Sequence, residues 1–93
     1  MTLLMKLKRL FGGYKPDCEY WVYTKEINVP SEYYKTRIGE AKWQRKLHYW
    51  EETGEFESPI LLDRDINLVD GFSSVRIAQM NDIQKVPVHF VKE

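Results

Sequence analysis

The clearest pattern of apolar and polar positions lies in residues 59–91 of the printed sequence. Residues 60–62 and 66–69 are apolar almost throughout, which predicts strands that are central in a sheet or covered on both faces. The polar residues 63–65 between them predict a tight, hairpin-like connection. Residues 86–91 alternate loosely between apolar and polar side chains and predict a final strand.

A helix is expected between these strands, because Asp70 and Gly71 end the second apolar run and helical spacing follows. The side chains that can cap its first turn are Asp70, Ser73 and Ser74. The positions expected to face inward are Val75, Ala78, Phe72 and Ile83. Asn81 and Asp82 predict the end of the helix, since asparagine tolerates the left-handed conformation that a helix end requires.

A strand is predicted earlier in the chain. Residues 20–24 are dense in aromatic and β-branched side chains, which are typical of strands. We expect this strand to continue through Ile27 and Val29 as far as Pro30, with a turn at Ser31.

Residues 39–53 have helical spacing, with Trp43, Leu47 and Trp50 at positions i, i+4 and i+7. The simplest interpretation of this apolar stripe is that it packs into the core. Gly54 stands where a C-terminal cap belongs, because glycine adopts the left-handed conformation without strain.

Together these elements indicate one α+β domain in residues 16–93, a small mixed β-sheet flanked by helices. Residues 1–15 predict a basic amphipathic arm, in which Gly12 and Gly13 end a short helix. Its apolar positions are Leu3, Leu4, Leu7, Leu10 and Phe11. We expect them to pack on the domain or on a protein partner; a membrane surface or nucleic acid is the competing interpretation.

Composition narrows the class of protein. Lys and Arg together number 14, as do Asp and Glu, so the net charge is zero and the overall positive charge of many nucleic-acid binders is missing. No apolar run approaches the roughly 20 residues of a membrane span. Cys18 is the only cysteine, which excludes an internal disulfide and suits a reducing, cytoplasmic setting.

The unit of strand, Gly71 and helix places backbone N–H groups at a crevice, where proteins hold phosphates and other anions. Basic residues in the first half of the preceding helix, and acidic residues near its end, oppose the helix dipole. The basic residues are Lys42, Arg45 and Lys46, with Lys35 and Arg37 upstream, and the acidic ones are Glu51, Glu52 and Glu55. This arrangement fits a plain solvated face or a cluster that meets an anion. The predicted ligand-binding residues are Asp70, Gly71, Ser73, Ser74, Arg76, Lys42, Arg45 and Lys46.

The spacing assigns no catalytic residue and no metal ligand. His48 and His89 are not at metal-ligand spacing from each other. Asp63, Asp65 and Asp70 suit a magnesium-nucleotide complex, since magnesium prefers carboxylate oxygens. The favoured interpretation is that Asp63 and Asp65 serve the turn and Asp70 the helix cap. The sequence therefore assigns no cofactor, and a nucleotide with magnesium is the one candidate that it offers.

A family resemblance emerges from the same residues. The pattern tGxFxsPIxLdxdxxLVDGFxxxRxAxxxxIxkVPVxFV, from Thr53 to Val91, resembles the fold shared by the N-terminal domain of the chromosome-partitioning protein ParB and by sulfiredoxin. Residues 25–30 resemble the strand that opens that fold, so the resemblance covers roughly residues 24–92. ParB-like members carry Gly-Glu-Arg-Arg-x-Arg-Ala, whose arginines hold the triphosphate of a nucleotide. Gly71 matches the glycine of that motif and Arg76 its last arginine.

Other positions depart from the motif. Ser73 and Ser74 replace the paired basic residues. Phe72 stands where sulfiredoxin has its nucleophilic cysteine, so repair of peroxiredoxins is not expected. The resemblance therefore implies the fold, with Gly71 and Arg76 as what remains of the ligand site.

Two functions are compatible with these residues. The first is a small ParB-like domain that binds a phosphate-containing ligand, a nucleotide or a nucleic acid, without evident catalysis. The alternative is an adaptor or inhibitor that keeps the fold, has lost the pocket chemistry and binds a protein partner through the arm. A phosphoryl-transfer enzyme has the least support, because no base or lysine for it is identifiable from spacing.

Overall fold

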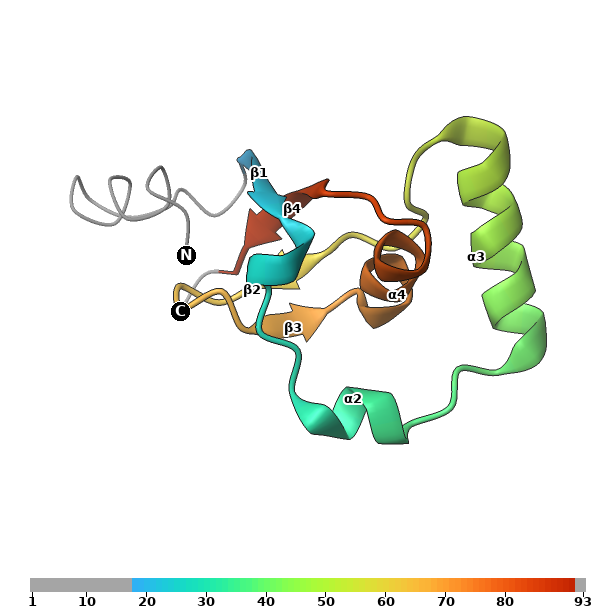
Figure 1. Cartoon of the computed structure of the whole chain (residues 1–93), viewed down its shortest axis with the longest axis horizontal. Coiled ribbons are helices and arrows are strands. Elements are labelled where there is room, and N and C mark those ends of the chain that lie inside the picture. The colour runs from blue at the N-terminus through green and yellow to red at the C-terminus, as the bar shows by residue number, and fades with distance from the viewer. Residues whose placement is uncertain (1–17, 92–93) are drawn as a thin grey trace.

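One mixed sheet organises residues 18–91, the part of the chain that the computed structural model describes (Figure 1). The four strands of this part are β1 (Glu19–Tyr23), β2 (Leu61–Leu62), β3 (Leu68–Asp70) and β4 (Lys85–Phe90). They stand in the order β1-β4-β2-β3. β4 is antiparallel to β1 and parallel to β2, and β2 is antiparallel to β3. The predicted α+β class with a small mixed sheet is therefore confirmed. The predicted arm, residues 1–15, lies outside the described residues.

The connection between β2 and β3 is the tight turn that the sequence predicts. The Asp63 carboxylate accepts hydrogen bonds from the backbone N–H groups of Asp65 and Asn67, both at 2.9 Å. Both strands are shorter than predicted, and β3 is an edge strand on which Val69 is 44% exposed. The expectation of a central or doubly covered strand is right for β2 and wrong for β3, because the sheet ends there.

The helix α4 (Phe72–Met80) begins directly after β3. Val75 and Ala78 are fully buried in the core, as predicted. The predicted side-chain caps are wrong. Gly71, which has no side chain, takes the N-cap position, and no side chain forms a cap hydrogen bond there. The Asp70 carboxylate instead accepts the Gly71 N–H at 2.8 Å.

The end of α4 and the last strand follow the prediction closely. The helix stops before Asn81, but Asp82, with φ of 54°, adopts the left-handed conformation expected of asparagine. β4 runs one residue earlier than predicted at each end.

The predicted first strand is interrupted. β1 ends at Tyr23, and Thr24–Glu26 form a 3-10 turn, η1, so the strand does not continue to residue 29. The Thr24 hydroxyl donates a hydrogen bond to the Ile83 carbonyl oxygen at 2.6 Å. This part-buried contact joins the turn to the segment before β4, which the local sequence could not reveal.

Two helices connect η1 to β2. The short helix α2 (Ser31–Lys35) stands where only a turn was predicted. The helix α3 (Glu40–Thr53) has its predicted extent to within one residue. Gly54, with φ of 74°, ends it as predicted and donates its N–H to the Trp50 carbonyl oxygen at 2.8 Å.

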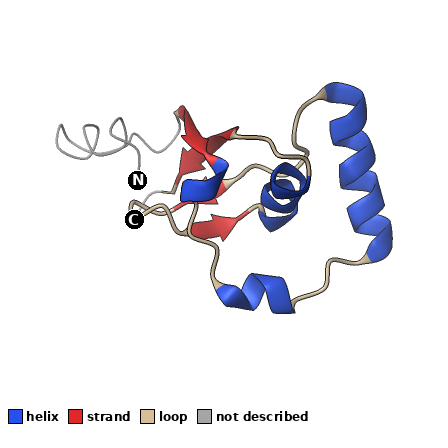
Figure 2. Ribbon diagram, in the orientation of Figure 1, coloured by secondary structure: helices blue, strands red, loops and turns tan. Residues whose placement is uncertain are grey.

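The position of α3 corrects one prediction. It lies beyond α4 and away from the sheet (Figure 2). Trp43, Leu47 and Trp50 are consequently only half-buried, and the expectation that they fill the core is wrong. The buried residue of α3 is Lys46, which is 8% exposed.

The hydrophobic core combines side chains from the sheet, from α4 and from the segments between them. Its buried members are Val22, Ile27, Ile60, Leu62, Ile66, Leu68, Val75, Ala78, Val86, Val88 and Phe90. Among the helices of residues 18–91, none has the length and hydropathy needed to cross a membrane.

Candidate ligand-binding site

A cavity of about 310 Å³ lies between the start of α4, the first half of α3 and the loop that joins α2 to α3. Among the predicted ligand-binding residues, those that line it are Lys42, Lys46, Asp70, Gly71 and Ser73. The other lining residues are Tyr33, Thr36, Arg37, Ile38, Gly39, Ser58 and Phe72. The fold thus brings basic side chains of one helix to the N-terminus of another.

Gly71 makes the turn from β3 into α4 at the edge of this cavity. Its φ of 93° is a left-handed value that favours glycine. A Cβ on residue 71 would lie 2.3 Å from the carbonyl oxygen of Pro59 and 2.8 Å from the Cα of Ile60. Backbone packing alone therefore requires this glycine, and the contact fixes where α4 begins.

The Lys46 ammonium is the most buried charge of the cavity. Nζ donates hydrogen bonds to the hydroxyl oxygens of Ser58 and, at 3.2 Å, Ser73. Within the described residues it forms no ion pair. Burial, followed by the positive charge of the neighbouring Lys42, lowers the pKa of Lys46 below its ordinary 10.5, and the more distant carboxylates of Glu57 and Asp70 offset only part of this. The side chain is thus a desolvated cation whose contacts are two neutral hydroxyls.

The lining as a whole is positive. Arg37, Lys42 and Lys46 face one carboxylate, that of Asp70. The first turn of α4 adds backbone N–H groups, which no side chain caps in the described residues. Because the N-terminus of a helix carries partial positive charge, the basic side chains and the helix both favour a negatively charged ligand. The arrangement suits an anion with several oxygen atoms.

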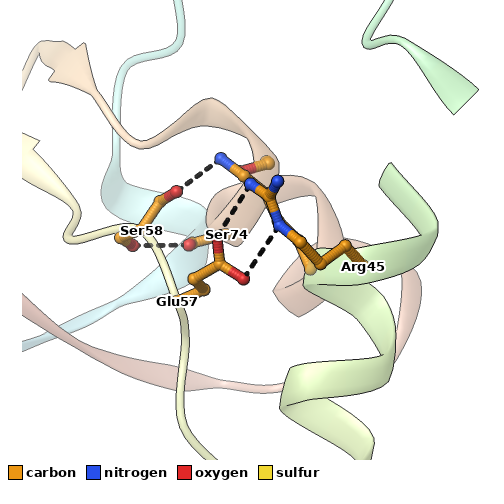
Figure 3. A network of polar contacts seen from close by, with 6 residues as sticks. Arg45, Glu57, Ser58 and Ser74 are labelled. Carbon is orange, nitrogen blue, oxygen red and sulfur yellow. Dashed lines mark hydrogen bonds and ion pairs between the residues drawn. The ribbon is translucent and has the colours of Figure 1, made fainter. Parts of the chain in front are cut away.

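Arg45 and Ser74 take part in a network of polar contacts with Glu57 and Ser58 (Figure 3). Arg45 forms an ion pair with Glu57 at 2.9 Å, outside the cavity lining. The Ser74 hydroxyl donates to the Ser58 carbonyl oxygen at 2.6 Å and is 2% exposed. The structure does not bring these two predicted residues into the lining.

Arg76 lies in a neighbouring hollow of about 350 Å³. Its guanidinium carbon stands 5.7 Å from the centroid of the Tyr34 ring, and its Nη1 donates to Gln79 at 2.8 Å. The two hollows share Thr36, Arg37, Ile38 and Phe72. Arg76 is therefore adjacent to the cavity and does not line it.

Phe72 acts as a packing residue. Its ring centroid lies 5.3 Å from that of Tyr33 and 5.3 Å from that of Tyr34, so it joins α2 to the start of α4. Tyr33 also donates its hydroxyl to the Val69 carbonyl oxygen at 2.8 Å. These contacts hold the loop after α2 over the cavity.

The sequence did not identify every lining residue. Arg37 belongs to the predicted basic cluster, but Thr36, Ile38, Gly39, Tyr33 and Ser58 were missed as site residues. Gly39 had one local signal, since it is the first residue of a predicted helix, and in the structure it takes the N-cap position of that helix. The others reach the cavity through tertiary folding alone.

The three aspartates considered for magnesium do not converge. Asp70 pairs with Leu61 at one end of the β2–β3 hairpin, whereas Asp63 and Asp65 lie in the turn at the other end. In residues 18–91 no group of three or more histidine, cysteine or acidic side chains is arranged to hold a metal ion.

Comparison with known proteins identifies the fold. A solved structure of a Pnob8-like ParB-N domain in its C2221 form has a TM-score of 0.66 and 16% identity, over 82% of this chain and 30% of the other. A solved pNOB8-like ParB N-domain has a TM-score of 0.64 and 19% identity, over 78% and 26%. The chain thus spans less than a third of either structure. No protein-family model matches, and no curated protein does either. The resemblance that the sequence suggested is confirmed at the level of structure, and the chain has a ParB N-domain-like fold.

Proposed function

We propose that this small ParB-like domain binds a phosphate-containing ligand, a nucleotide or a nucleic acid, in the cavity at the start of α4, without evident catalysis. The observation that carries the proposal is Lys46, a lysine that is only 8% exposed and whose ammonium is held by two hydroxyls. A buried charge is costly unless it is paired. Glu57 and Asp70 act on Lys46 only from a distance, and a phosphate in the cavity would place negative charge in direct contact with it.

The surrounding groups fit the same ligand. Lys42 and Arg37 would contribute further charge, and the Ser73 hydroxyl and the N–H groups of α4 would contribute hydrogen bonds. Asp70 is the one acidic group in the lining. It is suited to contact a magnesium ion that accompanies a nucleotide, because magnesium prefers carboxylate oxygens and commonly uses one or two of them.

Arg76 has a secondary place in this proposal. Its hollow adjoins the cavity through the loop after α2, so a ligand larger than a phosphate could extend toward it. Tyr34 and Trp43 line that hollow and offer ring faces to a base.

Ligand titration tests the proposal. The purified full chain is heated with ATP, CTP, GTP or a short DNA, each with and without magnesium, and its thermal midpoint is recorded. A ligand at 100 times its dissociation constant should add about 2.7 kcal/mol of stability. For a domain of this size that gain corresponds to a shift of roughly 10 °C or more.

Two neighbouring cations of α3 provide matched variants. Lys46→Met should abolish the shift, because it removes the buried cation and keeps a side chain of similar length. Arg45→Met should preserve it, since Arg45 is paired with Glu57 outside the cavity. The proposal would be contradicted if none of the four ligands shifted the thermal midpoint, or if both variants showed the same shift.

The alternative function, an adaptor or inhibitor that has lost the pocket chemistry, has support of its own. Phe72, Ser73 and Ser74 replace the ligand-binding motif, and each is engaged in contacts within the domain. Capture of a partner by the full chain but not by a chain lacking residues 1–13 would favour this function. We place the protein in the cytoplasm under either function, which the single exposed thiol of Cys18 suits.

A further inference from the structure

A second hollow, of about 470 Å³, lies against the β1–β4 side of the sheet and the end of α3. Its apolar lining includes Trp21, Trp50, Phe56, Pro59 and Pro87, and we call it the tryptophan groove. Apart from Ser58, it shares no lining residue with the phosphate cavity. Any role of this groove is therefore separate from the proposed function.

The groove exposes an apolar face of the sheet. Side chains alternate along β1, so that Tyr20 and Val22 join the core while Trp21 points the other way. Trp21 is paired with Pro87 on β4 and is 59% exposed. A large aromatic side chain left open beside a groove commonly marks a binding surface.

Two acidic residues line the groove, Glu55 just after the end of α3 and Glu19 at the start of β1. Glu51, in the last turn of α3, adds negative charge to that end of the helix without lining the groove. α3 has no basic residue in that turn, although the C-terminus of a helix carries partial negative charge. Lys85 and His89 also line the groove, on β4. The α3 end of the groove thus favours an apolar segment that carries positive charge.

The chain itself contains such a segment. Residues 1–15 have four basic side chains and no acidic one, and their leucines recur at helical spacing. Residue 18 directly precedes Glu19, which lines the groove. The seven residues 12–18 can span at most about 24 Å, and such a short link gives an effective concentration on the order of millimolar. An intrinsic dissociation constant below about 1 mM would then keep the groove mostly occupied.

We propose that residues 3–11 dock as an amphipathic helix in the tryptophan groove of their own chain. The leucines cover Trp21 and Trp50, and Lys6, Lys8 and Arg9 lie toward the acidic end of α3. This mode is the one by which amphipathic helices bind apolar grooves in general. The arm would thereby complete the outer face of the sheet and offset the dipole of α3.

Disulfide trapping tests this docking in the full chain. With Cys18→Ser to remove the native thiol, Leu7→Cys is combined with Glu55→Cys, and disulfide formation is followed in dilute protein by mass spectrometry. The control adds Leu4→Asp and Leu10→Asp, which keep the same tether but remove the apolar face. We expect the intrachain disulfide to form about tenfold faster without these two aspartates, reflecting the higher effective concentration of a docked segment.

A groove variant gives the reciprocal check. Trp21→Ser should slow trapping as the aspartates do, and because Trp21 is largely exposed the domain should stay folded. Equal rates in the parent pair, the aspartate control and the groove variant would mean chance encounters and would overturn the proposal. Disulfides that join two chains would overturn it too, by making a second copy the occupant.

Discussion

Pro59 and Gly71 approach so closely that residue 71 has no room for a side chain. An added Cβ would lie 2.3 Å from the Pro59 carbonyl oxygen, and the φ of Gly71 is 93°. The segment that enters β2 is therefore pressed against the start of α4, where the candidate phosphate cavity lies. The agreement of Gly71 with the ParB motif thus reflects the fold at least as much as any ligand.

Gly71→Ala should strongly destabilise the domain, because the substitution combines a strained φ with a clash against backbone atoms. We expect a loss of more than about 2 kcal/mol in the free energy of unfolding, measured by urea denaturation. Gly54→Ala separates the two effects, since Gly54 has φ of 74° but nothing within 4 Å of its added Cβ. That variant should lose only about 1 kcal/mol. Equal losses in the two variants would show that the Pro59 contact is unimportant.

The half-buried stripe of α3 leads to a second prediction. Leu62→Ala should cost about 2 to 5 kcal/mol, because Leu62 is fully buried between β4 and β3. Leu47→Ala, on α3, should cost clearly less, about 1 kcal/mol, since its side chain keeps partial contact with solvent. Urea denaturation of the two variants measures both losses. A loss for Leu47→Ala as large as that for Leu62→Ala would support the prediction from the sequence that the apolar stripe of α3 packs into the core.

This contrast shows what the apolar pattern can and cannot determine. Trp43, Leu47 and Trp50 predict a helix and its limits, because helical periodicity and the glycine cap are local properties. Periodicity does not identify the surface against which the stripe packs. α3 lies beside α4 and away from the sheet, so its stripe remains half-exposed while Lys46 is buried.

The candidate site is predictable to a similar extent. The strand, Gly71 and the helix follow one another directly in the sequence, so local patterns correctly predict the start of α4. The sequence also predicted the basic cluster on α3. It did not predict which residues of that cluster line the cavity. Arg45 and Lys46 are neighbours in sequence and about 100° apart around the helix. Only the packing of α3 on α4 determines that Lys46 turns inward while Arg45 meets Glu57.

The β2–β3 turn should give the protein an acid-sensitive component of stability. Burial raises the pKa of Asp63, but hydrogen bonds from Asn67 and from the Asp65 N–H outweigh it and hold the pKa below 3.8. Because the folded pKa is the lower one, the stabilisation is full above about pH 5 and is lost as pH falls through the folded pKa.

Asp63→Asn should therefore lower stability by about 1 to 2 kcal/mol at pH 7, where it removes charge-assisted hydrogen bonds. Urea denaturation at pH 7 and at pH 3 measures the difference between the variant and the parent protein. We expect that difference to shrink at the lower pH. A difference that stays constant would mean that ionisation of Asp63 contributes nothing.

Replacement of Lys46 should separate binding from stability. In the absence of ligand, Lys46→Met removes a desolvated ammonium but leaves the hydroxyls of Ser58 and Ser73 without their donor. These effects oppose each other, so stability should change by no more than about 1 kcal/mol. A loss several times larger, measured by urea denaturation, would mean that Lys46 serves chiefly to hold α3 in place.

The pH dependence of binding provides the sharpest test of the role of Lys46. An anion prefers the protonated ammonium, and the pKa of Lys46 is lowered, first by burial and then by Lys42. Affinity for the nucleotide that binds most tightly should therefore be full at neutral pH. It should begin to fall at a pH below that expected from an ordinary lysine pKa of 10.5. Lys46→Arg keeps its charge throughout, because the guanidinium pKa exceeds about 12. Affinity is measured by calorimetric titration of both proteins between about pH 7 and pH 10. Ionisation of other groups and of the ligand affects both proteins alike, so it drops out of the comparison. Parallel pH profiles would separate Lys46 from the ligand, whereas a fall confined to the parent protein would place its charge in the binding site.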